Sequence, residues 1–431
     1  MTAPTAPATA GSAVDDTPVA SRIGYRTPIA YALAALAVLV LFALRTPGGV
    51  QTTFQFASGS GWLTIPNWAV PSLLAAWLLT VLLLAATAYA FSLTRQRRAV
   101  PAWLHTVAGL AFVLAFLVWV GAGLTRVIPV TSLLAGALAL SVPLIFGAMS
   151  GIVCERSGVI NIAIEGQLLF GAFAAAVIAS RLASPYVGLV AAPIAGAMVG
   201  ALLAWFAVRY QVNQIIVGVV LNTLVIGLTG FFFSTVLSAD AGAWNARQPL
   251  GKIDIPVLSE IPVIGPVLFR QTLLVYVMYV LVIVLQVMLF RSRWGLRTRA
   301  VGEHPKAADT VGIKVNTRRV CNVVLGGAIA GLGGAFFTLG SGLAFGREMS
   351  AGQGYIALAA MILGRWSPRG AVLAALLFGF SKNLGNVLST IGSTVPSELL
   401  LMLPYLITIF AVAGFVGRVR PPAASGVPYV K

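Results

Sequence analysis

The chain has 431 residues, of which 59% are hydrophobic and only 9% are charged, and its mean hydropathy is +0.95. A soluble domain is about half apolar and about a quarter charged, so this composition excludes a water-soluble globular protein. The formal charge of +17 comes from 28 Lys and Arg against 11 Asp and Glu. These basic residues stand beside apolar spans, where the positive-inside bias of membrane proteins accounts for them. The charge therefore does not indicate nucleic-acid binding.

Apolar stretches follow one another along the chain. A helix that crosses a bilayer needs about 20 residues, and we expect an all-α polytopic membrane protein with about 10–12 transmembrane helices. Residues 353–364 form a shorter apolar piece, which as a helix would rise only about 18 Å, and it is predicted to be a half-helix or a re-entrant segment. The other expected spans are 28–44, 70–91, 102–121, 131–149, 162–180, 187–208, 214–237, 271–290, 320–343, 370–390 and 398–417.

Charge in the connecting loops predicts the orientation of these spans. Residues 95–98 (RQRR) and the loop 291–319 are basic, which indicates the cytoplasmic side. Loop 45–69 carries one charge, Arg45, and loop 238–270 balances three acidic residues against three basic ones, so both are expected outside. Strict alternation of the spans then places both termini in the cytoplasm.

No residue pattern predicts catalysis or a bound metal. The two cysteines, Cys154 and Cys321, form no CxxC pair, and His105 and His304 are the only histidines, so a zinc site is not expected. The sequence shows no Ser/His/Asp set, no HExxH and no nucleotide fingerprint. We therefore expect no enzyme, no cofactor and no metal.

Glycines recur four residues apart within the predicted spans. Such pairs let helix backbones approach closely. The stretch GGAIAGLGG (326–334) lacks the GxxxxGK[ST] spacing of a phosphate-binding loop, so we expect it to be a packing surface. The pairs are Gly147 with Gly151, Gly196 with Gly200, Gly327 with Gly331, and Gly342 with Gly346.

Polar residues interrupt the apolar pattern at residues 150–172, SGIVCERSGVINIAIEGQLLFGA. A charge near the middle of a bilayer costs several kcal/mol unless it is paired or hydrated. In one interpretation Glu155 and Arg156 lie at the cytoplasmic boundary. Asn161 then caps the next helix, and Glu165 stands in its first turn, where the helix dipole favours a carboxylate. In the other interpretation the segment is a broken helix that lines a polar path, because unwound backbone persists at membrane depth only when it is buried in protein or faces water.

The basic loop 291–319 also contains a predicted short helix within EHPKAADTVGI. Pro305 suits a first helical turn, and Gly312 can end the helix. Ala307 and Ala308 give it a small surface, and a surface helix with an Ala face can dock in a groove on a soluble partner. Anchoring of the loop to lipid headgroups is the alternative.

Four stretches together resemble a known family. They are GIVCERSGVINIAIEGQLLFGAFAAA, VNQIIVGVVLN (212–222), GLRTRAVGEHPKAADTVGIKV (295–315) and GYIALAAMILGRWSPRGAVLAALLFGF (354–380). Over about 131–417 the chain is similar to permease subunits of bacterial ABC importers for nucleosides and simple sugars, the same broad group as ribose and branched-chain amino-acid permeases. The form ERSGVINIAIEG resembles the nucleoside branch most.

The resemblance implies a permease subunit that carries a nucleoside or a simple sugar and hydrolyses no ATP itself. It implies a pore of two permease subunits that are usually different chains, cytoplasmic ATPase modules that are often fused, and an external substrate-binding lipoprotein. The coupling helix that docks on the ATPase would map to about 302–313. The candidate coupling residues are Glu303, His304, Pro305, Ala307, Ala308 and Gly312.

On this interpretation the polar segment either lines the translocation path or braces the helix break beside it. We expect Glu155 and Arg156 to serve the protein's structure. Glu165 would share a helix face with Asn161, and we expect it to serve transport. The other intramembrane polar groups, for which pore lining and interhelical hydrogen bonding are the alternatives, are Asn222, Lys382, Asn383 and Asn386.

We expect a protein of the bacterial plasma membrane in four parts. These are a disordered N-terminal tail (1–25), an N-terminal transmembrane extension (26–125), the permease core (126–417) and a cytoplasmic C-terminal tail (418–431). An ion-coupled secondary transporter of a small polar solute is the alternative function. Such proteins often show inverted repeats and intramembrane carboxylates, whereas this sequence has no convincing repeat and few acidic residues.

Overall fold

The computed structural model describes residues 25–56, 65–392, 395–396, 399, 402 and 420–430. Within these residues ten helices are long and apolar enough to cross a membrane. The prediction of an all-α polytopic membrane protein is therefore confirmed, and each of the ten overlaps an expected span. The expected span 398–417 and the tail 1–25 lie outside the described residues, apart from Tyr25, Leu399 and Met402.

The chain divides into two compact units, one of residues 1–48 with 72–119 and the other of 49–71 with 120–431. The smaller unit contains α1 (Arg26–Ala37), which continues through η1 (Val38–Phe42) and η2 (Ala43–Arg45), together with α2 (Ser72–Arg95) and α3 (Ala102–Gly121). Small and branched apolar side chains from all three helices, such as Ala35, Leu83 and Ala111, form its core. A hydrogen bond between the Tyr31 hydroxyl and His105 Nδ1 (2.6 Å) joins α1 to α3.

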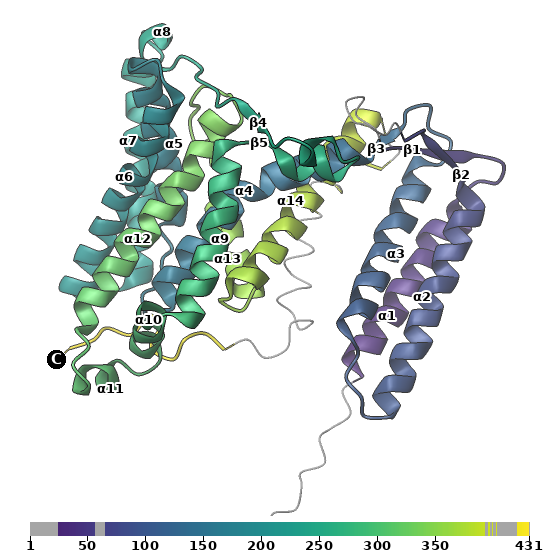
Figure 1. Ribbon diagram of the computed structural model, residues 1–431, viewed down its shortest axis with the longest axis horizontal. Helices are drawn as coiled ribbons and strands as arrows, with labels where there is room; N and C mark the ends of the chain where they lie inside the picture. The colour runs from purple at the N-terminus through teal and green to yellow at the C-terminus, as the bar shows by residue number, and fades with distance from the viewer. Residues whose placement is uncertain are drawn as a thin grey trace, which may run out of the picture. The chain divides into compact units, whose positions relative to one another are not determined.

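The larger unit is built around α4 (Val130–Glu155), which is almost entirely buried (Figure 1). Helices α12 (Val315–Ala335), α13 (Gln353–Leu363) and α14 (Pro368–Ile391) pack against it, and α5 (Ile164–Arg181) and α6 (Pro185–Ala204) pack against each other and against α12. Backbone contact between α6 and α12 needs glycine on both helices, because a Cβ at Gly196 would overlap the Gly327 carbonyl oxygen. Close packing is confirmed for the pairs Gly196 with Gly200 and Gly327 with Gly331, whereas it is wrong for Gly342 with Gly346, because both lie outside the helices and a Cβ at Gly346 would meet no close neighbour among the described residues.

The remaining helices complete the larger unit. Several end in a short π-helical turn, where a crossing helix meets its loop. The elements are η3 (Trp205–Arg209), α7 (Gln214–Phe232), η4 (Phe233–Leu237), α8 (Ala241–Trp244), η5 (Leu258–Glu260), η6 (Gly265–Phe269), α9 (Leu273–Arg291), α10 (Arg293–Glu303), α11 (Pro305–Thr310) and η7 (Phe336–Gly340).

Two small sheets stand at loops of the larger unit. The first has the order β2-β1-β3, in which β1 (Gln51–Gln55) pairs antiparallel with β2 (Trp68–Pro71) and parallel with β3 (Ile128–Pro129). The second pairs β4 (Lys252–Asp254) with β5 (Arg270–Thr272) in antiparallel register.

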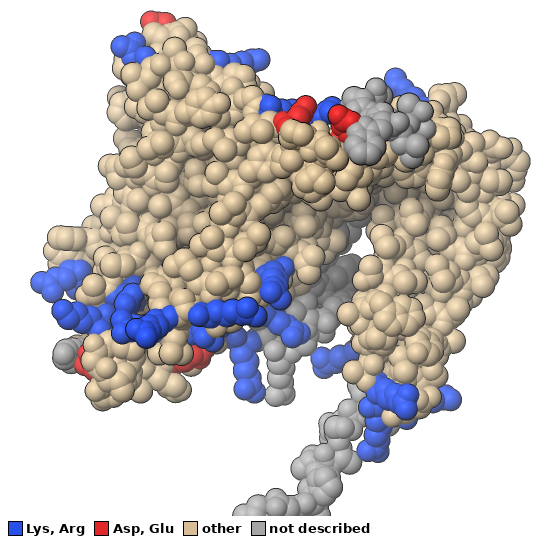
Figure 2. Space-filling model, viewed as in Figure 1, with Lys and Arg blue, Asp and Glu red and all other residues tan. Residues whose placement is uncertain are grey.

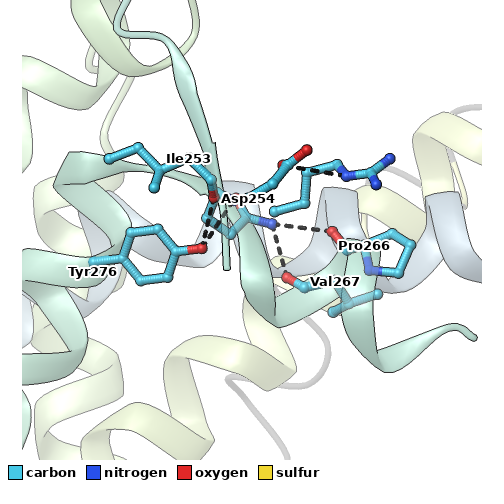
Figure 3. A network of polar contacts seen from close by, with 7 residues as sticks. Ile253, Asp254, Pro266, Val267 and Tyr276 are labelled. Carbon is cyan, nitrogen blue, oxygen red and sulfur yellow. Dashed lines mark hydrogen bonds and ion pairs between the residues drawn. The ribbon is translucent and has the colours of Figure 1, made fainter. Parts of the chain in front are cut away.

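Polar contacts tie the second sheet to the start of α9 (Figure 3). The Tyr276 hydroxyl donates to the Ile253 carbonyl oxygen (2.9 Å), and Gln271 Nε2 donates to the Val267 carbonyl oxygen (2.7 Å). Arg270 Nε lies 3.2 Å from the Asp254 carboxylate. Loop 238–270 is therefore held to the start of α9 by hydrogen bonds as well as by the chain itself.

Candidate functional site

The first polar segment is an unwound stretch at depth. Helix α4 ends at Glu155 and α5 begins at Ile164, and the residues between them are not helical. The Ile164 side chain packs against Gly147 and Gly151 of α4. Since a helix rises 1.5 Å per residue, α5 begins about 6–12 Å inward from the end of α4. The chain between α4 and α5 therefore runs back alongside the last turns of α4 before α5 begins.

A second break faces the first. Residues 341–352 between η7 and α13 are not helical, and α13 has 11 residues, too few for a full crossing. Helix α13 runs in the same direction as the end of α4, because Ala357 packs at Gly147 and Met361 at Gly151. The expected short segment at 353–364 is thus a half-helix that follows an unwound stretch.

Glu165 joins the two breaks. Its side chain is 5% exposed, and its carboxylate accepts three hydrogen bonds: from Ser350 Oγ (2.6 Å), from the Gly352 amide (2.8 Å) and from the Gly354 amide (2.6 Å). The N-terminus of a helix leaves backbone N–H groups without partners, and Glu165 satisfies them for α13 from the first turn of α5. These contacts favour a bracing role over lining of a path.

Asn161 does not cap α5, so that expectation is wrong. The cap position is Ala163, and no side chain bonds there. Asn161 is fully buried, and its Nδ2 donates to Ser150 Oγ (3.1 Å) on α4 and to Gln167 Oε1 (3.0 Å) on α5. Because Asn161 precedes the helix, it also shares no helix face with Glu165. It fastens the unwound stretch to the two helices on either side of it.

Asn222 of α7 closes the other side of the same stretch. Its Oδ1 accepts from the Gly166 amide (2.8 Å), and its Nδ2 donates to the Ile162 carbonyl oxygen (2.9 Å). The same Nδ2 lies 3.1 Å from the hydroxyl of Tyr355, a half-exposed residue in the first turn of α13. Of its two alternatives, these contacts favour interhelical hydrogen bonding.

Glu155 and Arg156 grip the turn between α13 and α14. Trp366 Nε1 donates to Glu155 Oε2 (2.6 Å), and Arg156 Nε donates to the Trp366 carbonyl oxygen (3.1 Å). Arg365 and Trp366 both have positive φ, 55° and 51°, a conformation that side chains with a Cβ adopt at a cost. The adjacent acid and base therefore do not pair with each other, and together they hold a strained turn.

The polar residues on α14 lie in different surroundings. Asn383 is buried and donates to the Leu133 carbonyl oxygen of α4 (2.8 Å). Asn386 is exposed, and Lys382 is half-buried. The structure therefore does not bring these three residues into one polar cluster, and only Asn383 joins two helices.

The short helix predicted in the basic loop is α11, and its two alanines lie on different sides of the helix. Ala307 is exposed, whereas Ala308 is 3% exposed and packs with Val301 and Val315. The expectation that both form one outward Ala face is wrong, because a helix turns about 100° per residue. Outward positions are taken by Glu303, His304 and Ala307, and Pro305 is half-buried in the first turn. Gly312 follows the helix with a φ of +83°, which favours glycine.

The basic loop is in contact with the first break. A Cβ at Gly302 would overlap the Arg156 carbonyl oxygen, so α10 packs directly on the turn after α4. Burial lowers the pKa of the Arg156 guanidinium, and the nearby Glu303 carboxylate opposes that shift. A displacement of α10 and α11 therefore meets the residues that hold the α13–α14 turn.

The C-terminal segment 420–430 returns to the same place, which the sequence did not predict. Amides of Ala424 and Gly426 donate to the carbonyl oxygens of Gly302 (2.8 Å) and Gly158 (3.2 Å). Tyr429 packs in the cluster of Ala308, and burial and the Asp309 carboxylate raise the pKa of its hydroxyl. The available signal was a Tyr among small residues and prolines after the last span.

Other bracing residues also escaped sequence reasoning. Ser350, Gly352 and Gly354 lie in a Gly-rich stretch between apolar segments, a pattern typical of unwound chain. In the described ranges no group of three or more His, Cys, Asp or Glu residues could hold a metal. Glu165, Asn161 and Asn222 each find hydrogen-bond partners at the breaks, whereas the buried Gln214 Nε2 beside the first break has none among the described residues.

A helical membrane protein in which two helix breaks face each other has an organisation typical of transporters. The family model for the branched-chain amino acid transport system permease component matches residues 133–412. The chain belongs to this family. The smaller unit, made of residues 1–48 and 72–119, lies outside the match.

Curated relatives cover the same region. The guanosine ABC transporter permease protein NupQ of Bacillus subtilis is 39% identical over 306 residues, which is 68% of this chain and 95% of the relative. The nucleoside ABC transporter permease protein NupC of Lactococcus lactis is 38% identical over 308 residues, 69% of this chain and 96% of the relative. A second guanosine permease protein of Bacillus subtilis, NupP, is 28% identical over 282 residues, 64% of this chain and 80% of the relative. No solved structure matches the chain.

Proposed function

We propose that the chain is a permease subunit of an ATP-driven importer and that its substrate is a nucleoside. The observation that carries this proposal is the 39% identity to a guanosine permease over 95% of that protein's length. Simple sugars are the alternative substrate class, which the resemblance of the four sequence stretches keeps open.

A second, different permease chain completes the pore in this proposal. Two guanosine permease proteins of one Bacillus match this chain at 39% and 28% identity. A chain that served alone as both halves of a pore would not be expected to match one of the two so much better. The chain then corresponds to the NupQ half of a pair.

Helix α11 is the proposed contact with the cytoplasmic ATPase. Ala307 of α11 and His304 just before it are exposed, whereas the Glu303 carboxylate at the end of α10 accepts a hydrogen bond from the Ala423 amide of the C-terminal segment (3.2 Å). Ala308 and Tyr429 fasten its inward side to the permease. A helix held on one side and open on the other can transmit a push from a docked partner.

The proposed transmission runs through contacts that touch one another. Helix α10 meets the turn at Arg156, and Arg156 and Glu155 hold the turn at Trp366. That turn connects α13 to α14, and the other end of α13 is capped by Glu165. Movement of the coupling loop would in this way reach both helix breaks.

Orientation and the remaining partner follow from the same proposal. Both termini lie in the cytoplasm, which is supported by the C-terminal segment that packs on the coupling loop. The loop 238–270, stiffened by the β4–β5 pairing, faces outward and receives the substrate-binding lipoprotein. A topology reporter inserted at residue 255 should read outside and one at residue 305 inside, and the reverse pattern would overturn the orientation.

Uptake of labelled nucleosides tests the proposed substrate. Cells with the gene deleted and cells with it restored are given labelled guanosine, adenosine or cytidine, with labelled ribose and leucine as controls. We expect restoration to raise uptake of at least one nucleoside and to leave ribose and leucine unchanged. A response confined to ribose would move the assignment to sugars, and a response confined to leucine would refute the nucleoside assignment.

A further inference from the structure

A groove of about 700 Å³ opens where α10, the loop after α11 and α12 meet. Its wall on α10 includes Leu296 and Arg297, and its wall on α12 includes Arg318 and Cys321. Val311, which is 74% exposed, and Lys314 also line it. The groove adjoins the coupling region, since Val311 and Gly312 line it, but the exposed His304 and Ala307 do not.

The groove carries an uncompensated positive charge. Arg297, Lys314 and Arg318 line it, and no acidic residue of the described chain does. Their side chains make no hydrogen bond or ion pair with another described residue. Figure 2 shows that Lys and Arg gather in a band along this edge of the larger unit, below a broad surface with few charges. A ligand that fits must therefore bring negative charge.

An apolar stripe leads away from the groove along α12. Cys321 and Leu325 are exposed, and Ala328 and Leu332 are half-buried, at intervals of three or four residues that place them on one helix face. A neighbouring face of α12 packs against α6 through Gly327 and Gly331. Helix α12 is long and apolar enough to cross the membrane and the groove lies at its first turns, so we infer that the stripe meets the hydrocarbon and the groove the headgroups.

We propose that this groove binds the headgroup of an anionic phospholipid. The phosphate lies among Arg297, Lys314 and Arg318, and an acyl chain follows Cys321 and Leu325 along α12. Basic pockets between transmembrane helices on the cytoplasmic side are suited to anionic headgroups. The bound lipid would fix α10 to α12 beside the coupling helix. The proposal does not depend on which solute the permease carries.

The test measures retained lipid on the full-length chain purified with its partner subunits. The complex is incubated with dioleoyl-phosphatidylglycerol or with dioleoyl-phosphatidylcholine, and bound lipid is counted by native mass spectrometry. The variants are Lys314→Gln and the triple change of Arg297, Lys314 and Arg318 to Gln. The matched control changes Arg95, Arg97 and Arg98 to Gln, which removes the same charge from exposed positions in the smaller unit.

We expect phosphatidylglycerol to bind saturably and phosphatidylcholine to bind much more weakly. Near a membrane surface each cation contributes about a fivefold effect, so Lys314→Gln should weaken binding about fivefold and the triple change about a hundredfold. The control should bind as the wild type does. Because the single change replaces an exposed side chain, its result stands even if the triple variant is poorly folded.

Several outcomes would overturn the proposal. Equal retention by the groove variants and the control would place the lipid elsewhere. Equal binding of both lipids would remove the role of charge. Saturable binding of inorganic phosphate alone at the groove would show a site for a free anion. Lipid bound to the isolated chain but absent from the complex would show that a partner subunit covers the groove.

Discussion

Replacement of Glu165 by Gln distinguishes a structural role of this residue from a role in lining the translocation path. The Glu165 carboxylate accepts bonds from Ser350 Oγ, the Gly352 amide and the Gly354 amide at 2.6–2.8 Å. In Glu165→Gln, Oε1 can keep the first two, but Nε2 then points its hydrogens at the Gly354 N–H. A buried donor left without a partner costs about 1–3 kcal/mol, and we expect a loss of stability of that size. Glu165→Ala removes all three bonds and should cost more, about 3 kcal/mol or above.

The assay combines thermal unfolding of the purified complex with guanosine uptake normalised to the amount of permease in the membrane. Glu348→Gln is the matched control, because Glu348 is exposed in the same unwound stretch that supplies the partners of Glu165. We expect Glu165→Gln to lower the unfolding temperature and the membrane abundance, and Glu348→Gln to change neither. Unchanged stability together with a loss of uptake per folded molecule would contradict the bracing role and assign Glu165 to the path.

The other predictions concern the coupling region. Ala308→Glu would bury a charge in the chain's own cluster, so it should lower membrane abundance, whereas exposed Ala307→Glu should leave abundance intact and reduce co-purification of the ATPase; equal effects of the two changes would contradict the orientation of α11. Trp366→Phe removes the donor to Glu155 and should destabilise the purified complex by about 1.5–3 kcal/mol in thermal unfolding. An unchanged unfolding temperature would show that the hydrogen bond between Trp366 and Glu155 does not stabilise the turn between α13 and α14. Tyr429→Ala should speed protease cleavage within residues 303–314, and cleavage at the wild-type rate would show that the C-terminal segment does not hold the loop.

Membrane class, span positions and glycine packing could be predicted from the sequence because each depends on local composition. Ten spans were found in the described residues, and Gly196 and Gly327 meet as expected. The half-helix at 353–364 was also predictable, since its apolar run is too short to cross.

The partners of the polar residues could not be predicted. Glu165 bonds to residues 185–189 positions later in the chain, and Glu155 to a residue 211 positions later. No periodicity in one sequence encodes such pairings, because they depend on how the breaks meet in space. Ala308 illustrates the same limit: a small residue suits an outward docking face and a tight inward contact equally well, and here it packs against the C-terminal segment.

Reconstitution in proteoliposomes tests whether this permease is driven by ATP and carries a nucleoside. The complex of this chain with its partner permease, ATPase and binding protein is reconstituted, and labelled guanosine uptake is followed with ATP on the ATPase side or with an imposed Na⁺ or H⁺ gradient. We expect uptake that requires ATP, persists when ion gradients are collapsed and is lost in Ala307→Glu. Uptake that follows the ion gradient without ATP would contradict the account and favour an ion-coupled secondary transporter.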